Sequence, residues 1–400
     1  MPKLSFTLDR FQPSPIGEVF SLATRLKAEG RDIVDLSIGE PQFDTPDHIK
    51  QAAWAAIRAG KTKYTATTGT KALKEAIQRK FRRDNGLDFP LDRIVVASGA
   101  KPLIFYALQA MLDAGDEVLI PTPCWTSYPG MVQLLNADPV FLPTAQQDGF
   151  KLRPEDLAAA VGPRTRCLML CSPSNPTGSA YSAEEIRALG AVLAEHPDLW
   201  ILSDDLYEHI VFDDFAFATM AAEVPQLAAR VVTVNGVSKA YAMTGWRIGY
   251  AAGPKDLMDA IAKVMSQSVG SPPDMSQAAA VAALDGPQDF LRDWAAQYQA
   301  RRDMTLAGVN AIPGLRADKP EGSFYVFPHC GALLGKTTAG GQAIDSSTDL
   351  VRHLLEDWGV ALVPGAAFEA DPYFRISCAA SQAAIAEGLR RIAAAAEALN

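Results

Sequence analysis

The feature that most constrains the fold is an alternation of strand and helix patterns between residues 90 and 255. Short apolar runs rich in β-branched residues end in turn residues, and helical stretches at 102–113 and 183–195 separate some of them. The predicted strands are Arg93–Ser98, Glu117–Pro121, Val140–Pro143, Cys167–Cys171, Trp200–Ser203, Val231–Asn235 and Ile248–Ala252. Such alternation is typical of a mostly parallel sheet with helices on both faces, so we predict an α/β fold with a seven-stranded sheet.

The pattern changes after about residue 290, where a long charged helix at 289–307 begins. The strands predicted beyond it are 322–327, 360–363 and 374–377. They indicate a smaller α+β domain, and the N-terminal residues, which have no clear strand alternation, are expected to pack on it. The predicted division is 45–290 for the large domain, and 1–44 with 291–400 for the small one. An alanine-rich helix at 384–398 is predicted to present Arg390 and Arg391 to solvent.

Composition excludes several classes of function. The net charge of −9 argues against a general binder of nucleic acid or anionic membranes. No apolar run reaches the roughly 18 residues of a membrane span, and the N-terminus has no signal-peptide pattern. The five cysteines are scattered, which favours a reducing cytoplasm. The five histidines lack the spacing of a zinc site, so no metal is expected.

Two rigid loops follow predicted strands. Ser98-Gly99-Ala100-Lys101-Pro102 opens a helix, and free N–H groups at a helix start bind anions. Ser172-Pro173-Ser174-Asn175-Pro176-Thr177-Gly178 is a loop at the carboxyl end of a strand, where open α/β sheets bind ligands. Taken alone, the first loop is more simply interpreted as an ordinary strand–helix turn. In the second loop, the rigid residues around Asn175 slightly favour a functional role.

Two charged positions follow further strands. Asp204 ends the run Trp200-Ile201-Leu202-Ser203 and needs a cationic partner if it is buried, unless it only caps the next helix. Lys239 lies in an apolar, small-residue stretch after Val231–Asn235, which are conditions that make a lysine amine nucleophilic. Arg247 follows eight residues later and offers planar donors suited to a phosphate. A lysine on the surface is the default interpretation of such a residue. The apolar and small neighbours of Lys239 make that interpretation the weaker of the two.

Together these segments resemble the pyridoxal-phosphate enzymes of aminotransferase class I/II, fold type I. The resemblance covers almost the whole chain, and it is nearest to the bacterial aspartate/prephenate aminotransferase branch. Its motifs run from Ser37-Ile38-Gly39-Glu40-Pro41 through Lys63-Tyr64-Thr65 and the four segments above to Tyr373-Phe374-Arg375-Ile376-Ser377. Each motif is modest alone, and their order and spacing make the resemblance specific.

The resemblance implies pyridoxal 5'-phosphate as cofactor and a role for each matching residue. Lys239 resembles the Schiff-base lysine, which also moves the proton between substrate Cα and cofactor C4′. Asp204 resembles the partner of the pyridine nitrogen, and Tyr207 the hydrogen-bond partner of the ring hydroxyl oxygen. These three are the predicted catalytic residues. The predicted cofactor-binding residues are Gly99, Ala100, Lys101, Trp125, Asn175, Asp204, Tyr207, Ser238, Lys239, Arg247 and, in the neighbouring subunit of a homodimer, Tyr64.

The resemblance leaves the substrate open. The predicted substrate-binding residues are Gly39, Lys101, Trp125, Asn175 and Arg375. Lys101 resembles a lysine that faces the distal carboxylate in the aspartate/prephenate branch, whereas Ile16 stands where that branch tends to carry a hydroxyl residue. Transfer from aspartate or a similar donor to a 2-oxo acid such as 2-oxoglutarate, by a ping-pong mechanism, is the leading hypothesis. The alternatives are an aminotransferase for aromatic or neutral amino acids, a C–S β-lyase on the same cofactor, and a non-catalytic descendant, which the retained Lys239 argues against.

Overall fold

The computed structural model describes residues 2–13 and 15–400. A seven-stranded sheet forms the centre of the larger lobe, with strand order β2-β8-β7-β6-β5-β3-β4. Its strands are β2 Ile94–Ala97, β3 Glu117–Thr122, β4 Asp138–Pro143, β5 Thr165–Cys171, β6 Trp200–Asp204, β7 Val231–Gly236 and β8 Gly249–Ala252. Only β8 runs antiparallel to its neighbours, so the prediction of a mostly parallel α/β sheet is confirmed.

Alternate residues of each strand face opposite sides of the sheet, and both sides are buried. Val95 and Ala97 of β2 pack with one group of helices, while Ile94 and Val96 pack with another. The first group is α4 Ala100–Met111, α5 Ser127–Leu134 and α9 Lys255–Ser266. The second face carries α2 Asp47–Arg58, α3 Lys71–Lys80, α6 Pro154–Ala160, α7 Ala183–Ala194, α8 Met220–Glu223 and α10 Asp274–Asp285. Burial on both faces explains why the strands read as continuous apolar runs.

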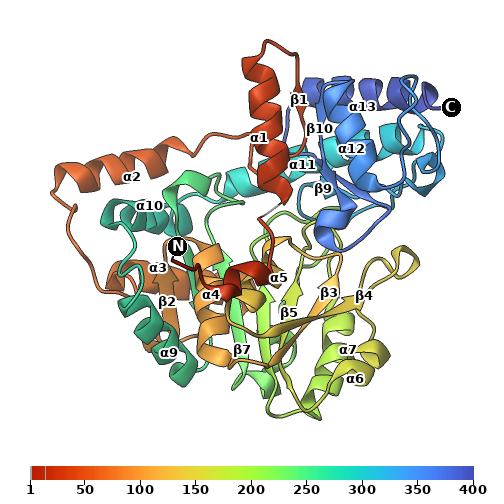
Figure 1. Cartoon of the computed structure of the whole chain (residues 1–400). Coiled ribbons are helices and arrows are strands. Elements are labelled where there is room, and N and C mark those ends of the chain that lie inside the picture. Colours follow the sequence, from red (N-terminus) through yellow and green to blue (C-terminus); the bar gives the residue numbers. More distant parts are fainter. Residues whose placement is uncertain (1, 14) are drawn as a thin grey trace.

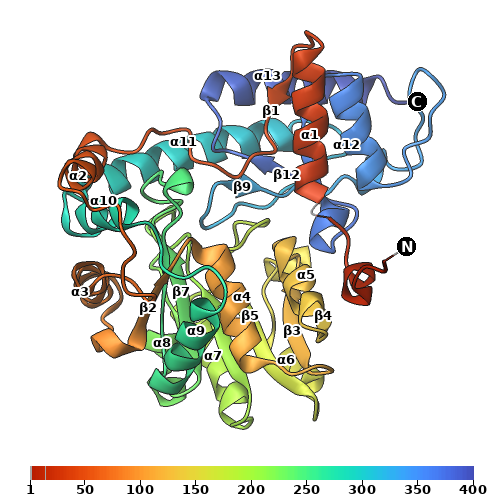
Figure 2. The ribbon, with the colours of Figure 1, turned by 60° about the vertical axis from the view of Figure 1, so that its left-hand side comes forward.

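The smaller lobe combines segments from both ends of the chain (Figures 1 and 2). Its helices are α1 Pro15–Ala28, α11 Asp289–Asn310, α12 Ser347–Glu356 and α13 Gln382–Glu397. Its strands are β1 Val34–Asp35, β9 Tyr325–Val326, β10 Val360–Ala361, β11 Val363–Pro364 and β12 Phe374–Ser377. β1 pairs in parallel with β10, and β11, β12 and β9 form a separate antiparallel sheet. The run predicted as one strand at 360–363 is therefore divided between two sheets.

The remaining short elements connect these layers. They are the 3-10 helices η1 Phe6–Arg10, η3 Leu91–Arg93, η4 Gln146–Asp148, η5 Pro225–Leu227, η6 Thr244–Trp246, η7 Gly331–Leu333 and η8 Gly365–Phe368, and the π-helical turn η2 Phe81–Asn85. Within η1, Arg10 forms an ion pair with Asp138 at 2.8 Å, so the first residues lie against β4 of the larger lobe. No helix in the described ranges is long and apolar enough to cross a membrane.

One surface prediction on α13 is wrong. Arg390 is exposed as expected, but the Arg391 side chain is only 14% exposed. Its Nη1 donates a hydrogen bond of 2.9 Å to the carbonyl oxygen of Asp32, and its Nε lies 2.7 Å from a carboxylate oxygen of Glu387. The helix packs beside β1, and sequence periodicity alone does not reveal how wide the covered face of a helix is.

Candidate active site

The topology brings the predicted site segments to one edge of the sheet. β5, β6 and β7 are parallel, so the loops after Cys171, Asp204 and Gly236 leave the sheet side by side. β8 is antiparallel and pairs with both β2 and β7, so its amino end, preceded by Arg247, reaches the same edge as the loop after β2. The loops enclose a cavity of about 300 Å³ between the lobes. This edge is where open α/β sheets bind ligands.

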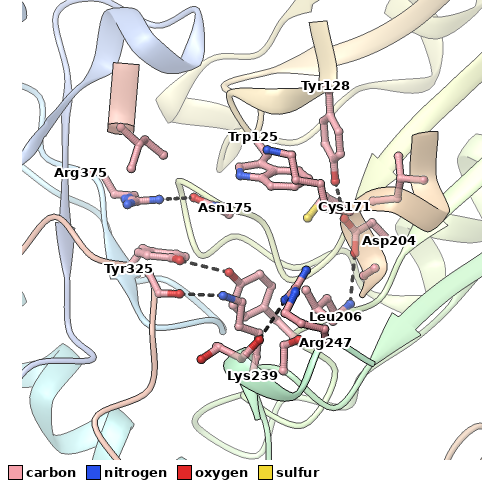
Figure 3. Close-up of a pocket in the computed structure, with 18 residues that line it drawn as sticks. Trp125, Tyr128, Cys171, Asn175, Asp204, Leu206, Lys239, Arg247, Tyr325 and Arg375 are labelled. Atoms are coloured by element: carbon pink, nitrogen blue, oxygen red, sulfur yellow. Dashed lines mark hydrogen bonds between the residues drawn. The ribbon is translucent and has the colours of Figure 1, made fainter. Parts of the chain in front are cut away.

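Most of the predicted site residues line this cavity. Those that do are Gly39, Ala100, Lys101, Trp125, Asn175, Asp204, Tyr207, Ser238, Lys239, Arg247 and Arg375. Gly99 lies directly behind the lining, whereas the side chain of Tyr64 is fully exposed and does not contribute to the cavity of its own chain. Figure 3 displays the side chains that converge, with Lys239 below Trp125 and Arg375 on the side away from Asp204.

Lys239 extends into the cavity from the loop after β7. Its Nζ donates a hydrogen bond of 2.6 Å to the carbonyl oxygen of Gly39 (Figure 3). Burial, followed by repulsion from Arg375, lowers the pKa of Lys239 to about 8, while Glu40 acts in the opposite direction. A lysine amine with this pKa is partly neutral near physiological pH, and it can therefore act as a nucleophile or a base.

Asp204 ends β6 at the base of the cavity and is 5% exposed. Its Oδ2 accepts a hydrogen bond of 2.6 Å from the hydroxyl of Tyr128, and its Oδ1 accepts one of 3.3 Å from the backbone N–H of Leu206. Burial raises the pKa of Asp204 despite these two bonds. No lysine or arginine forms an ion pair with Asp204 in the parts of the chain that are described, so this carboxylate is ready to accept a cationic N–H from a ligand.

The opposite wall carries Arg375, which comes from β12 of the smaller lobe and is fully buried. Its Nη1 donates to Oδ1 of Asn175 at 2.8 Å, and its Nη2 donates to the carbonyl oxygen of Ser37 at 2.6 Å. Its guanidinium lies 4.3 Å from the ring centre of Tyr325, whose hydroxyl is 3.1 Å from that of Tyr207. Nε of Arg375 is buried and has no hydrogen-bond partner among the described residues. An anion can therefore still bind this arginine.

The start of α4 and Arg247 form a compact cationic corner. Gly99 has a φ of 109°, a conformation that favours glycine, and a Cβ there would lie 2.3 Å from Nη2 of Arg247. Arg247 itself has a φ of 58°, and its Nη1 donates to the carbonyl oxygen of Thr244 at 2.9 Å. The twelve-residue helix α4 directs its free N–H groups toward this corner. Guanidinium and helix N-terminus together suit a phosphate.

Seven lining residues were not among the predicted site residues, and three of them are Tyr128, Tyr325 and Cys171. Tyr128 lies one helical turn beyond Trp125 and contacts Asp204, Tyr325 contacts Tyr207, and Cys171 ends β5 beside them. Tyr325 falls within the strand predicted at 322–327, so only the direction of its side chain was unknown. No local sequence pattern identified Tyr128, because its partner lies 76 residues further along the chain.

Comparison with known proteins identifies the family. The family model described as "Aminotransferase class I and II" matches residues 31–392. The chain belongs to this family. An aspartate aminotransferase of Rhizobium meliloti is 53% identical over 387 residues, which are 97% of this chain and 94% of the relative. An aspartate/prephenate aminotransferase of Cereibacter sphaeroides is 50% identical over 394 residues, which are 98% of each chain.

Solved structures agree with this assignment. The crystal structure of the aspartate aminotransferase from Rhizobium meliloti matches with a TM-score of 0.97 at 51% identity and covers 100% of both chains. Aspartate aminotransferase from Thermus thermophilus with maleate matches with a TM-score of 0.92 at 38% identity, over 99% of this chain and 100% of that one. The protein is therefore an enzyme that depends on pyridoxal 5'-phosphate and transfers an amino group between an amino acid and a 2-oxo acid.

Proposed function

We propose that the physiological substrates are dicarboxylic, with aspartate as amino donor and 2-oxoglutarate as acceptor in a ping-pong cycle. The observation that carries this proposal is the charge of the cavity. Lys101, Arg247 and Arg375 all line it, and none of them forms an ion pair with a carboxylate of the described residues. One phosphate and two substrate carboxylates are three anionic groups, one for each of these three cationic side chains. The relatives named aspartate aminotransferase add support.

The residues present fit the cofactor. Asp204 offers a buried anionic acceptor for the pyridine N–H, and the corner formed by Gly99, Ala100, Ser238 and Arg247 suits the phosphate. We assign the ring face to Trp125. We assign the ring hydroxyl oxygen to Tyr207 and to Asn175, which keeps its Nδ2 as a donor because its Oδ1 already accepts from Arg375.

When bound, the cofactor supplies a protonated ring that withdraws electrons from the substrate Cα. With the cofactor bound, Lys239 would accept the substrate Cα proton at its Nζ and later release it, a role that suits an amine with a pKa of about 8. Asp204 keeps a proton on the pyridine nitrogen, since an unpaired buried carboxylate favours a neighbouring positive charge. Arg375 holds the substrate α-carboxylate in a fixed orientation. Gly39 also lines the cavity, where its carbonyl oxygen accepts the hydrogen bond from Lys239.

A second candidate is activity on aromatic or neutral amino acids. Ile16, Ile104 and Trp125 line the same cavity as Lys101, so part of the wall that would face the substrate side chain is apolar. One of the relatives is named aspartate/prephenate aminotransferase. Apolar surface of this kind stabilises a ring or an alkyl chain, and a flexible lysine can turn toward solvent when the substrate has no distal charge.

Replacing Lys101 tests the substrate class. We expect Lys101→Ala to lower kcat/KM for aspartate by about 10–100-fold, because hydrogen bonds to charged groups contribute roughly 1.5–3 kcal/mol. For neutral and aromatic donors the same variant should change kcat/KM by less than about threefold, as measured with a panel of amino donors against 2-oxoglutarate. Lys336→Ala, at a half-buried position in the smaller lobe that does not line the cavity, is the control. Equal losses on all donors would mean that Lys101 serves only the cofactor corner, and wild-type preference for aromatic donors would favour the second candidate.

We also propose a homodimer with shared active sites. Tyr64 is fully exposed, and α2, which packs beside α10 at the edge of the molecule (Figure 1), leaves Trp54 and Ile57 exposed. A second copy of the chain would cover these apolar side chains and bring Tyr64 toward its phosphate corner. We further propose that the chain divides into a large domain of residues 45–290 and a small domain of residues 1–44 with 291–400. We also propose a cytoplasmic location.

The proposed dimer can be tested separately from the substrate class. Trp54→Asp should shift the molar mass measured by light scattering from two chains to one, because an unpaired charge would be buried in the contact. Tyr64→Phe should leave the mass at two chains and raise the dissociation constant for pyridoxal 5'-phosphate by about tenfold, the value of one hydrogen bond to a charged group. A wild-type protein that elutes as a single chain would refute the shared site.

A further inference from the structure

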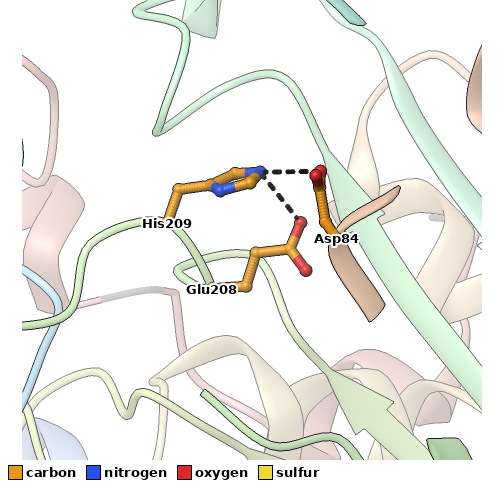
Figure 4. Close-up of side chains that lie close together, drawn as sticks. All are labelled: Asp84, Glu208 and His209. Carbon is orange, nitrogen blue, oxygen red and sulfur yellow. Dashed lines mark ion pairs between the residues drawn. The ribbon is translucent and has the colours of Figure 1, made fainter. Parts of the chain in front are cut away.

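A second group of charged side chains lies outside the cavity, next to the turn of residues 205–210 that carries Tyr207. Asp84, Glu208 and His209 each offer one atom within 4.8 Å of the others (Figure 4). Nε2 of His209 lies 3.3 Å from Oε1 of Glu208 and 3.6 Å from Oδ2 of Asp84. The ammonium of Lys80 contacts Glu208, and Nε of Arg83 lies 2.6 Å from Oδ1 of Asp84. Two protein cations therefore already balance the two carboxylates, and this cluster has no need of a metal ion.

The Lys80–Glu208 pair is the most deeply buried part of the cluster. The Lys80 side chain is 1% exposed and that of Glu208 is 4% exposed. Asn85 completes the pair, because its Oδ1 accepts from Nζ of Lys80 at 2.7 Å and its Nδ2 donates to Oε2 of Glu208 at 2.8 Å. Burial acts to raise the pKa of Glu208, but Lys80, His209 and Asn85 together lower it to about 2. Glu208 is therefore charged, and a buried carboxylate is costly without its cationic partner.

The end of α3 is shaped to reach Glu208. The helix continues directly into the π-helical turn Phe81–Asn85, which ends at Gly86 with a φ of 66°. A π-turn is wider than an α-helical turn, and it lets Lys80 and Asn85, five positions apart, contact the same carboxylate. Such turns are uncommon within helices and are frequent near functional sites.

Glu208 is the neighbour in sequence of Tyr207, whose ring lines the active-site cavity. The two residues belong to a tight turn, in which the N–H of Glu208 donates to the carbonyl oxygen of Asp205 at 3.1 Å. The N–H of Ile210 donates to the carbonyl oxygen of Tyr207 at 2.8 Å. The Asp205 carboxylate is fixed at the start of the turn by the Ser203 hydroxyl at 2.7 Å and by the Thr219 hydroxyl. At the end of the turn, Glu208 binds Lys80 and Asn85, His209 lies 3.6 Å from Asp84, and the carbonyl oxygen of Ile210 accepts from the N–H of Ser323 at 2.8 Å. The contact of Glu208 with Lys80 is the most deeply buried of these side-chain contacts.

We propose that Glu208, bound by Lys80 and Asn85, is a positioning residue that holds the Asp205–Ile210 turn and so places the Tyr207 hydroxyl in the active site. The inference rests on the proposed role of Tyr207 toward the cofactor. Glu208 does not touch the cavity, and it acts through the backbone of the residue before it. Displacing a catalytic group by about 1 Å can lower a rate by as much as about 100-fold. We therefore expect that loss of this remote ion pair, by shifting Tyr207, slows catalysis.

The first experiment examines the turn itself in cofactor-free protein. Glu208→Gln keeps the size of the side chain and removes its charge. We expect amide hydrogen exchange in the peptide that contains residues 205–210 to become about tenfold faster, as measured by mass spectrometry. Arg79→Ala, which breaks the exposed pair with Asp285 one residue before Lys80, should leave that peptide unchanged. If the exchange rate of Glu208→Gln equals that of the wild type, the turn does not depend on Glu208 and the proposal is wrong.

The second experiment asks whether Glu208 acts through Tyr207. In holoenzyme, Glu208→Gln should lower kcat by about tenfold and shift the pH midpoint of the visible cofactor absorbance in the same direction as Tyr207→Phe. In a Tyr207→Phe background, Glu208→Gln should change kcat by no more than about twofold and the pH midpoint by no more than about 0.3 unit, because coupled residues give non-additive effects. Fully additive effects would overturn the proposal.

A milder variant covers the case in which Glu208→Gln does not fold. Asn85→Ala leaves the Lys80–Glu208 pair intact and removes one hydrogen bond to the carboxylate. It should shift the absorbance midpoint in the same direction by a smaller amount, and an unchanged midpoint would count against the proposal. Absence of amino transfer by the wild-type protein would refute the proposed function. The exchange experiment uses cofactor-free protein, so it would still show whether Glu208 holds the turn.

Discussion

Lys239→Ala is expected to lower kcat by at least about 10⁴-fold while the protein still binds pyridoxal 5'-phosphate. General acid–base catalysis alone contributes up to roughly 10⁴-fold, and the variant also loses the amine that attaches the cofactor. Nζ of Lys239 has the lowered pKa of about 8 that the proton transfer needs, and its hydrogen bond to Gly39 directs it into the cavity. Asp204 and Arg247 are unchanged, so the cofactor keeps its partners at both ends.

The measurement is kcat with aspartate and 2-oxoglutarate, together with cofactor binding by equilibrium dialysis. Lys101→Ala is the control for loss of a lysine from the same cavity, and it should keep its activity on neutral donors. Retention of more than a tenth of wild-type kcat by Lys239→Ala would show that another group moves the proton.

Asp204→Asn is expected to lower kcat by about 1,000-fold. Opposite charges about 4 Å apart interact by roughly 4 kcal/mol at an effective dielectric of 20, and this energy corresponds to about three factors of ten in rate. Asparagine has the same shape and can still accept the hydrogen bond of Tyr128, but its Nδ2 cannot accept from the N–H of Leu206, so the change removes the charge and one weak hydrogen bond of 3.3 Å. Initial rates with saturating aspartate and 2-oxoglutarate measure this loss.

The stability of the cofactor-free protein is the control for Asp204→Asn. Burial raises the pKa of Asp204 above its ordinary value of 3.8, so the folded state binds more protons than the unfolded state just above that pH. The contribution of Asp204 to the free energy of unfolding therefore falls as pH rises from about 4, and it is unfavourable at neutral pH. Asp204→Asn should thus be as stable as the wild type or more stable at pH 7, as measured by thermal unfolding. A variant that is less stable, or that keeps kcat within tenfold, would contradict the assigned role.

The sequence predicted the central sheet well because its strands are buried on both faces. The strands contain apolar runs, such as Ile94–Ala97 and 167–171, and such runs are recognisable without any tertiary information. The predicted residues at the ends of β5, β6 and β7 converge because parallel strands end at one edge. Their order also carried the family resemblance, which the family comparison confirmed.

Contacts between distant segments could not be predicted in this way. Arg391 was expected in solvent, but it contacts Asp32, which lies 359 positions earlier. Tyr128 supports Asp204, and Lys80 pairs with Glu208, although neither residue has a distinctive local pattern. The single run at 360–363 divides between two sheets because its partners, β1 and β12, come from opposite ends of the chain. Such pairings depend on packing, which the period of a sequence does not encode.

The most direct test of the central claim is a single-turnover experiment with wild-type holoenzyme and L-aspartate alone. An aminotransferase without an acceptor must stop after one half-reaction. We therefore predict release of about one equivalent of 2-oxo acid per subunit, no free ammonia, and a cofactor absorbance change that reverses when 2-oxoglutarate is added. With cystathionine in place of aspartate, continuous release of pyruvate and ammonia without an acceptor would instead identify a lyase and contradict the account.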